Sequence, residues 1–219
     1  SIKSIYGEYA DLVFYPFDIS NYVFTMKEEL LDNIKDLKEK LRLLNIKLNE
    51  FNENIRTSAK DYTISFRKDQ IAKRINKDFR NGLDSNNYTL YVGSYGRNTD
   101  NVDVSDIDLL VILPWTYFTK YDAYQYNGQS CLLQAVKNSI ASTYSQTKMR
   151  ADGQVVQVTF SDLTFEIVPC FEYSDGSFCY ADTNNGGTWR IMYPRDEIKA
   201  VQNHNKETNY NMSALCRMM

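Results

Sequence analysis

The sequence is poor in histidine and cysteine, and these shortages exclude several kinds of catalytic site. The single histidine, His204, rules out a poly-histidine metal site, and Ser-His-Asp or Cys-His-Asn triads would require His204 itself. We interpret His204, in the polar stretch QNHNKETN, as a solvated loop residue. The four cysteines are scattered without a C-x-x-C pair, so we expect neither a zinc site nor a disulfide scaffold.

Long apolar runs and a strong excess of one charge are also missing. Without an apolar run of about 18 residues or a signal peptide, we expect no membrane segment, and the cytoplasm is the default location. The formal net charge is −3, whereas proteins that track long DNA or RNA are usually basic. A long nucleic-acid partner is therefore not expected, while small nucleotides carried with magnesium remain allowed.

A long amphipathic helix is predicted over residues 25–55, because apolar residues recur there at alternating steps of four and three. This apolar seam consists of Leu30, Ile34, Leu37, Leu41, Leu44, Leu48, Phe51 and Ile55. The favoured interpretation is a spine helix packed along the protein's own body. The alternative is a coiled-coil dimer, that is, helix-mediated self-association.

The rest of the sequence predicts a mixture of helices and strands. Helices are expected at 63–81, 127–144 and 212–219, and strands at 88–92, 106–113, 155–160 and 163–168, while 194–203 is a separate segment whose type the pattern does not assign. The last two strands would form a hairpin at Ser161-Asp162, and residues 174–187 are rich in turn formers. The final stretch, NMSALCRMM, is typical of the middle of an apolar helix, so we expect the front portion of a longer protein.

The stretch VGSYGRNTDNVDVSDIDLLVIL, residues 92–113, carries the chemistry, and Gly93-Ser94 is its first part. A glycine directly after a strand lets a phosphate approach the backbone, and Ser94 adds a hydroxyl donor. A short helix opening at about Tyr95 would add free N–H groups for a phosphate. Taken alone, a strand followed by Gly-Ser is typical of a plain turn.

The second part is Asp106-Ile107-Asp108 at the start of an apolar strand. Residues two apart on a strand project to one face, where two carboxylates would repel each other and be costly to bury. Bound divalent cations remove that cost, and a pair of metals suits the in-line displacement of phosphoryl or nucleotidyl transfer. The alternative is an exposed strand end with two solvated acids.

A third carboxylate is expected from Glu166, which interrupts the apolar strand TFEIVP. A buried lone acid is expensive, and a role as metal ligand or as the base for the attacking hydroxyl would explain it. The alternatives are an edge position with Glu166 facing water, or Asp162 as the third acid at the apparent turn.

The order of strand, Gly-Ser, a spacer of about a dozen residues and D-h-D-h-h-h (h is apolar) resembles the polymerase-β nucleotidyltransferase superfamily. The succession GSYGRNT, SDIDLLVILP, LLQAVK, DGQVVQVTF, FEIVPCFE and NGGTWR resembles, more closely, the bacterial cGAS/DncV-like nucleotidyltransferases (CD-NTases, SMODS-type). The resemblance runs from about residue 60 to the end.

The resemblance implies an α+β fold, a nucleotidyltransferase core with a mixed sheet flanked by helices. It also implies a long N-terminal spine helix and the start of a helical second lobe. The expected domains are residues 1–60 for the N-terminal segment and spine helix, 61–205 for the catalytic core, and 206–219 for the start of that lobe.

The resemblance also implies an activity. Such enzymes join nucleoside triphosphates (ATP, GTP or others) into cyclic di- or trinucleotides and release pyrophosphate. The product is a second messenger in antiphage defence, and it reaches a separate effector. The zinc insertion of animal relatives is absent from this sequence.

Roles for named residues follow from the same resemblance. Gly93 and Ser94 would hold the triphosphate, and Asp106, Asp108 and Glu166 would bind two Mg²⁺ (or Mn²⁺) ions. Relatives often carry Asp where Glu166 stands, and Glu is one methylene longer. Arg97 would contact phosphate unless it is a surface arginine, and Trp189 would stack near a base unless, as we favour, it belongs to the core.

Two other classes of function stay open. A toxin-type or antibiotic-modifying relative would AMPylate a protein or a small molecule, whereas a polymerase acting on RNA ends is disfavoured by the net charge of −3. A catalytically silent scaffold would keep the fold without turnover. Base choice, linkage and ring size are not encoded in these short motifs.

Overall fold

The computed structural model describes residues 19–55, 58–100, 104–209 and 211–218. The chain divides into two compact units, Ser1–Leu48 and Asn49–Met219, which are treated separately below. The expectations for residues 1–18 lie outside the described residues, and the expected domain limits remain predictions.

The first unit contains helix α2, Ile19–Ile55, whose last residues belong to the second unit. The predicted long helix is therefore confirmed, and it begins earlier than predicted. Ion pairs three or four residues apart support it, such as Asp36 with Lys40 (Nζ–Oδ2 2.7 Å), each worth a few tenths of a kcal/mol. Leu37 and Leu41 of the seam are exposed. A spine helix and self-association both remain predictions, and the side chains of Phe51 and Ile55 lie outside the description.

Seven strands of the described residues in the second unit form one mixed sheet, in the order β1-β2-β5-β4-β3, with β6 beside β5 and β7 beside β6. The pair β2–β5 is parallel, and the other pairings of these strands are antiparallel. The strands are β1 (Thr89–Tyr91), β2 (Asp106–Ile112), β3 (Lys148–Asp152), β4 (Val155–Thr159), β5 (Thr164–Glu172), β6 (Phe178–Asp182) and β7 (Thr188–Met192).

The predicted hairpin is confirmed, and its register follows from the two-residue turn. The N–H of Phe160 donates to the carbonyl oxygen of Leu163 at 2.9 Å across Ser161-Asp162. From this closing bond, β4 and β5 pair so that Gln157 lies opposite Glu166. Because a two-residue loop fixes the register, the turn alone decides which side chains of the two strands meet.

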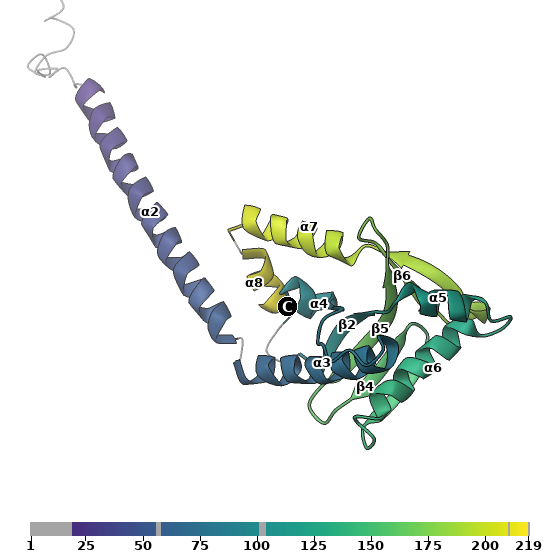
Figure 1. The fold of residues 1–219 in the computed structure, drawn as a ribbon. Coiled ribbons are helices and arrows are strands. Elements are labelled where there is room, and N and C mark those ends of the chain that lie inside the picture. Colours follow the sequence, from purple (N-terminus) through teal and green to yellow (C-terminus); the bar gives the residue numbers. More distant parts are fainter. Residues whose placement is uncertain (1–18, 56–57, 101–103, 210, 219) are drawn as a thin grey trace, which may run out of the picture. The chain divides into compact units, whose positions relative to one another are not determined.

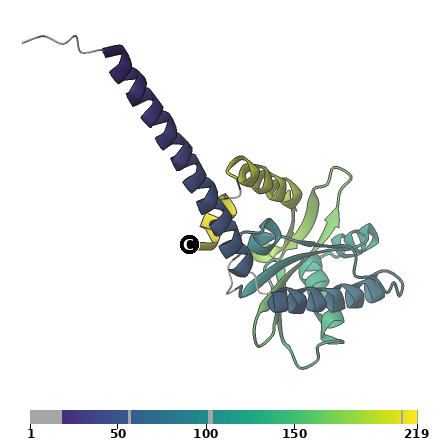
Figure 2. The same ribbon diagram turned by 90° about the vertical axis from the view of Figure 1, so that its left-hand side faces the viewer.

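Helices α3 and α6 cover one face of the sheet and form the main core with it. Both Figure 1 and Figure 2 show α7 on the opposite side of this unit from α3. The helices are α3 (Ser58–Phe79), α4 (Gly93–Arg97), α5 (Trp115–Asp122), α6 (Gly128–Ala141), α7 (Pro194–Glu207) and α8 (Asn211–Met218), with a short 3-10 turn at Asn184–Gly186. The expected mixed α+β fold is thereby confirmed.

Several elements differ from the sequence-based expectations. Helix α5 and strands β3, β6 and β7 were not predicted, and β6 lies inside the stretch taken as turn-rich. The loop assignment of His204 is wrong, because His204 lies in α7, although it is solvated as expected. No described helix combines the length and apolar character needed to cross a membrane.

The core behind the sheet is expected to control stability. Phe165 is fully buried in β5, whereas Phe66 on α3 is 52% exposed. We expect Phe165→Ala to lower the free energy of unfolding by about 3–5 kcal/mol through lost burial and a cavity. Phe66→Ala, the same change at the surface, should cost about 0.5 kcal/mol. Urea unfolding of both variants measures this, and equal losses would contradict the described core.

Candidate nucleotide and metal site

The alternation of β2 separates the core from the candidate site. Ile107 and Leu109 are fully buried on the side of α3 and α6. Asp106 is exposed and Asp108 half-buried on the other face, since successive strand residues alternate. The two carboxylates therefore share one face, as the sequence predicts.

Glu166 lies directly opposite Asp108, because β2 and β5 are parallel and these two residues are Cα partners. Neighbouring strands run about 4.8 Å apart, so the two acids are immediate neighbours on one face. The edge interpretation of Glu166 is wrong, since β5 is flanked by β2 and β4 and Glu166 is half-buried. The Nε2 of Gln157 on β4 donates a hydrogen bond of 2.8 Å to Oε1 of Glu166.

This crowding of acids is visible in the electrostatics of Asp108. Burial raises the pKa of Asp108 above its usual value, and the neighbouring carboxylates of Glu166 and Asp106 raise it further. The guanidinium of Arg97 acts in the opposite direction. Asp108 is thus a carboxylate whose charged form is disfavoured by the protein around it.

Gly93 and Ser94, which follow β1, lie beside Asp108 at the edge of the site. A short helix does open there, but at Gly93 rather than at about Tyr95. The N–H of Val92 donates to the carbonyl oxygen of Asp108 at 3.0 Å, which holds the start of α4 against β2. Gly93 has a φ of +61°, and a Cβ built on it would lie 1.8 Å from Oδ2 of Asp108. Only glycine leaves room for that carboxylate.

A hollow of about 300 Å³ lies at this place. Such a volume is at the lower end of the range for small-molecule sites. It is lined by Ser94, Thr99, Asp100, Val104, Ser105, Asp106, Asp108 and Cys216. The hollow thus brings Ser94 together with both aspartates and with the end of α8.

Arg97, the expected phosphate contact, is engaged by another residue. Its Nη1 lies 2.6 Å from Oε1 of Glu197 on α7, and 27% of the Arg97 side chain is exposed. The pair links the short helix α4 to α7. Glu197 is a residue that sequence reasoning missed, because an ion pair across about 100 residues leaves no local pattern.

The remaining sequence candidates lie elsewhere. Asp162 at the hairpin turn pairs with Arg67 (Nη1–Oδ1 2.7 Å). Trp189 packs against the core as favoured, with its ring 4.8 Å from that of Phe118 and its Nε1 donating to Asp122 at 2.9 Å.

The three acids fit a magnesium ion by donor chemistry and charge. Mg²⁺ prefers oxygen ligands, and a cation would favour the ionised form of Asp108, whose pKa is raised by burial and by the neighbouring carboxylates. Their side chains are not gathered as a set, because among the described residues no group of three or more His, Cys, Asp or Glu is placed to hold a metal. Instead, Oδ2 of Asp106 accepts a hydrogen bond of 2.8 Å from the hydroxyl of Ser105.

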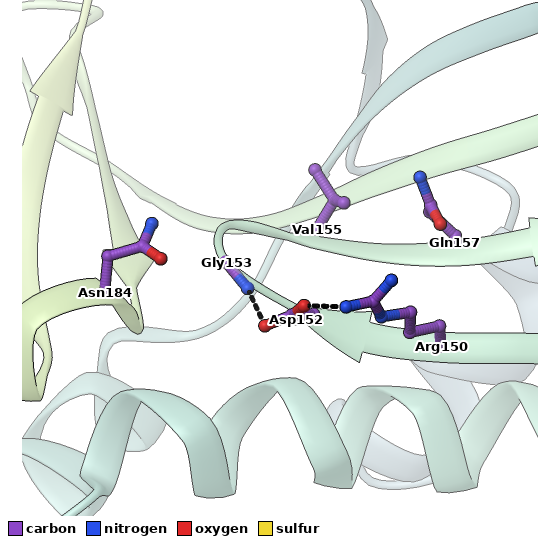
Figure 3. A pocket seen from close by; sticks show the side chains of 6 residues that line it. All are labelled: Arg150, Asp152, Gly153, Val155, Gln157 and Asn184. Atoms are coloured by element: carbon purple, nitrogen blue, oxygen red, sulfur yellow. Dashed lines mark hydrogen bonds and ion pairs between the residues drawn. The ribbon is translucent and has the colours of Figure 1, made fainter.

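A second, smaller hollow of about 170 Å³ lies at the turn between β3 and β4 (Figure 3). It is lined by Arg150, Asp152, Gly153, Val155, Gln157 and Asn184, and Arg150 pairs with Asp152 there. Gln157 borders this hollow and also bonds Glu166. The two-residue turn at Ser161-Asp162 between β4 and β5 contained the signal for the Gln157–Glu166 contact, because its register sets these two residues opposite each other.

Comparison with solved structures defines the class of the fold. The chain is similar to the CD-NTase CdnG of Bradyrhizobium diazoefficiens in complex with GTP (TM-score 0.50, 12% identity, 71% of this chain and 45% of that one). It is also similar to CdnC of E. coli MS115-1 with ATP (TM-score 0.51, 15% identity, 78% of this chain and 50% of that one). The fold is therefore that of a CD-NTase nucleotidyltransferase.

The family is defined by sequence. The model of the Second Messenger Oligonucleotide or Dinucleotide Synthetase domain (SMODS) matches residues 43–205, and the chain belongs to this family. Among curated proteins it is similar to the cyclic GMP-AMP synthase CdnE03 of Staphylococcus schleiferi, with 24% identity over 150 residues. That match covers 58% of this chain and 46% of the relative, so the chain spans about half the length of these relatives.

The close approach of Gly93 to Asp108 can be tested with a matched glycine. Gly82 also has a positive φ (+83°), but a Cβ there would meet nothing within 4 Å. Gly82→Ala should lose about 1–2 kcal/mol of unfolding free energy from backbone strain. Gly93→Ala should lose about 1–3 kcal/mol more, because the new methyl collides with the carboxylate. Chemical denaturation of both variants gives the difference, and equal losses would show that Asp108 is not seated against Gly93.

Proposed function

We propose that this chain is the catalytic core of a synthase that joins nucleoside triphosphates into a cyclic di- or trinucleotide. The observation that supports the proposal most strongly is the register of β2 and β5. It sets Asp108 beside Glu166 on one face, and Gly93 lies directly against Asp108. Family membership supports the reaction class, because the family synthesises second-messenger oligonucleotides or dinucleotides.

In the proposed reaction, a hydroxyl oxygen of one nucleotide attacks the α-phosphorus of another. The new oxygen–phosphorus bond replaces the bond to pyrophosphate, which leaves. Ser94 would donate its hydroxyl to the triphosphate, and Gly93 would let the phosphates approach the backbone. The proton of the attacking hydroxyl would pass to a carboxylate of the site.

Asp106, Asp108 and Glu166 are proposed to hold two Mg²⁺ or Mn²⁺ ions. Such ions neutralise the charge that develops on the attacking and leaving oxygens. Asp108 and Glu166 would keep their places through the strand pairing, whereas the exposed Asp106 would turn from the Ser105 hydroxyl. A role in antiphage signalling and a cytoplasmic location remain predictions from the sequence.

The two nucleotides in solved relatives support the substrate class. CdnC is described with ATP and CdnG with GTP. We propose nucleoside triphosphates as substrates for this chain as well. The product would act through a separate effector.

The decisive experiment is product analysis with a matched carboxylate control. The chain is incubated with the four ribonucleoside triphosphates and Mg²⁺ or Mn²⁺, treated with phosphatase and analysed by mass spectrometry. We expect a phosphatase-resistant cyclic product from the wild type and from Asp162→Asn, whose acid pairs with Arg67 instead. Asp108→Asn should yield none, because it removes a carboxylate between Gly93 and Glu166.

Other outcomes separate the alternatives. A nucleotide found attached to a protein or a small molecule would replace the cyclase proposal with AMPylation. Nucleotide binding that is equally strong in the wild type and in Asp108→Asn, with no product from either, would favour a silent scaffold.

The ion pair of Arg97 leads to a separate prediction. If Arg97 contacts phosphate, Glu197 competes with the nucleotide for the Arg97 guanidinium, whose Nη1 lies 2.6 Å from Oε1 of Glu197. Glu197→Gln should then tighten nucleoside triphosphate binding by up to about fivefold, the equivalent of about 1 kcal/mol for an exposed pair. Glu207→Gln, on the same helix beside His204, is the control and should change nothing. Calorimetric titration measures both, and unchanged affinity in Glu197→Gln would mean that Arg97 does not contact the nucleotide.

A further inference from the structure

A row of polar residues crosses four adjacent strands on the face of the candidate site. Asp108 on β2 pairs with Glu166 on β5, Glu166 with Gln157 on β4, and Gln157 with Arg150 on β3. Residues that pair directly across strands share one face of the sheet. The two acids are therefore continued outward by an uncharged amide and then by an arginine.

Gln157 is held firmly in this row. Its neighbours Val156 and Val158 are fully buried in the main core on the opposite face, so the backbone of β4 cannot turn freely. The side chain of Gln157 is only partly buried, and it borders the hollow of Figure 3. From this anchored position its Nε2 donates to Oε1 of Glu166 at 2.8 Å.

We infer that Gln157 is a positioning residue that fixes the carboxylate of Glu166 for metal binding. The inference rests on the proposed function. A glutamate has more rotatable bonds than an aspartate, and a hydrogen bond to one oxygen restricts them while the second oxygen stays available. Groups that hydrogen-bond to metal ligands typically contribute about 10–100-fold to metal affinity or activity.

The absence of charge on the Gln157 side chain suits this positioning role. A lysine or arginine bonded to Glu166 would compete with a cation for the same carboxylate. Arg150, the next residue of the row, is paired with Asp152 instead, as Figure 3 shows. Gln157 thus orients Glu166 without neutralising it.

The turn between β3 and β4 offers a matched control, a glutamine–carboxylate hydrogen bond outside the candidate site. Gln154, at the β3–β4 turn, donates its Nε2 to Oδ2 of Asp182 at 3.3 Å. This bond has the same chemistry, glutamine to carboxylate, but Asp182 is paired with Arg190 and belongs to another part of the sheet.

The test is Mn²⁺ binding to the whole chain, followed by electron paramagnetic resonance of the free ion. We expect Gln157→Leu to weaken Mn²⁺ binding by about tenfold and Gln154→Leu to leave it at the wild-type value. Gln157→Met, unbranched and similar in length, serves as the second variant if the leucine change prevents folding. Wild-type affinity in a folded Gln157 variant would overturn the inference.

Asp108→Asn separates this result from the proposed function. If Asp108→Asn weakens Mn²⁺ binding and Gln157→Leu does not, the metal site stands and the role of Gln157 is refuted. If Asp108→Asn binds Mn²⁺ as the wild type does, the metal site of the proposed function fails, and the inference fails with it. Loss of Mn²⁺ binding in both Gln157→Leu and Gln154→Leu would also refute the inference, because a general distortion of the β3–β4 hairpin would explain both losses.

Discussion

The parallel pairing of β2 with β5 is the constraint on which the site depends. It sets Asp108 opposite Glu166, and the same pairing sets Ile107 opposite Phe165, both fully buried. Because side chains alternate along a strand, a slip of one residue would bury the acids and expose the core residues. The register that buries Ile107 and Phe165 is therefore also the register that places Asp108 beside Glu166.

The cost of this arrangement is concentrated at Asp108. Its pKa is raised by burial and by the carboxylates of Glu166 and Asp106, so its ionised form is the disfavoured one at this position. Gly93 adds to the crowding, since it admits the carboxylate only because it has no side chain. Such local conflict is typical of functional sites, and the apolar packing behind the sheet offsets it.

The sequence predicted the parts of the site that are local in the chain and missed the parts that are not. Asp106 and Asp108 share a face because of strand alternation, and Gly93-Ser94 follows β1 after a single residue, Val92. The partnership of Gln157 with Glu166 was within reach, because the two-residue hairpin turn fixes it. The ion pair of Arg97 with Glu197 was not, since only the tertiary fold brings α4 to α7.

The elements that sequence patterns failed to predict are explained by their surroundings. Strand β3, with the sequence KMRAD, is an edge strand whose alternate residues are exposed, so it lacks a strong apolar pattern. Strand β6, by contrast, is mostly buried, but turn-forming residues on both sides concealed it. Helix α5 has eight residues, too few for periodicity to separate it from a loop.

The charge around the hollow limits how a nucleotide would enter it. None of the described residues lining the hollow is a lysine or an arginine, whereas Asp100, Asp106 and Asp108 all line it. The positive charge of Arg97 is already paired with Glu197. A bare triphosphate would meet net repulsion at close range, where charges separated by about 4 Å in a partly buried site interact by several kcal/mol. Under the proposed function, the triphosphate therefore enters together with its divalent cation. The carboxylates of the hollow repel the triphosphate but attract the cation bound to it.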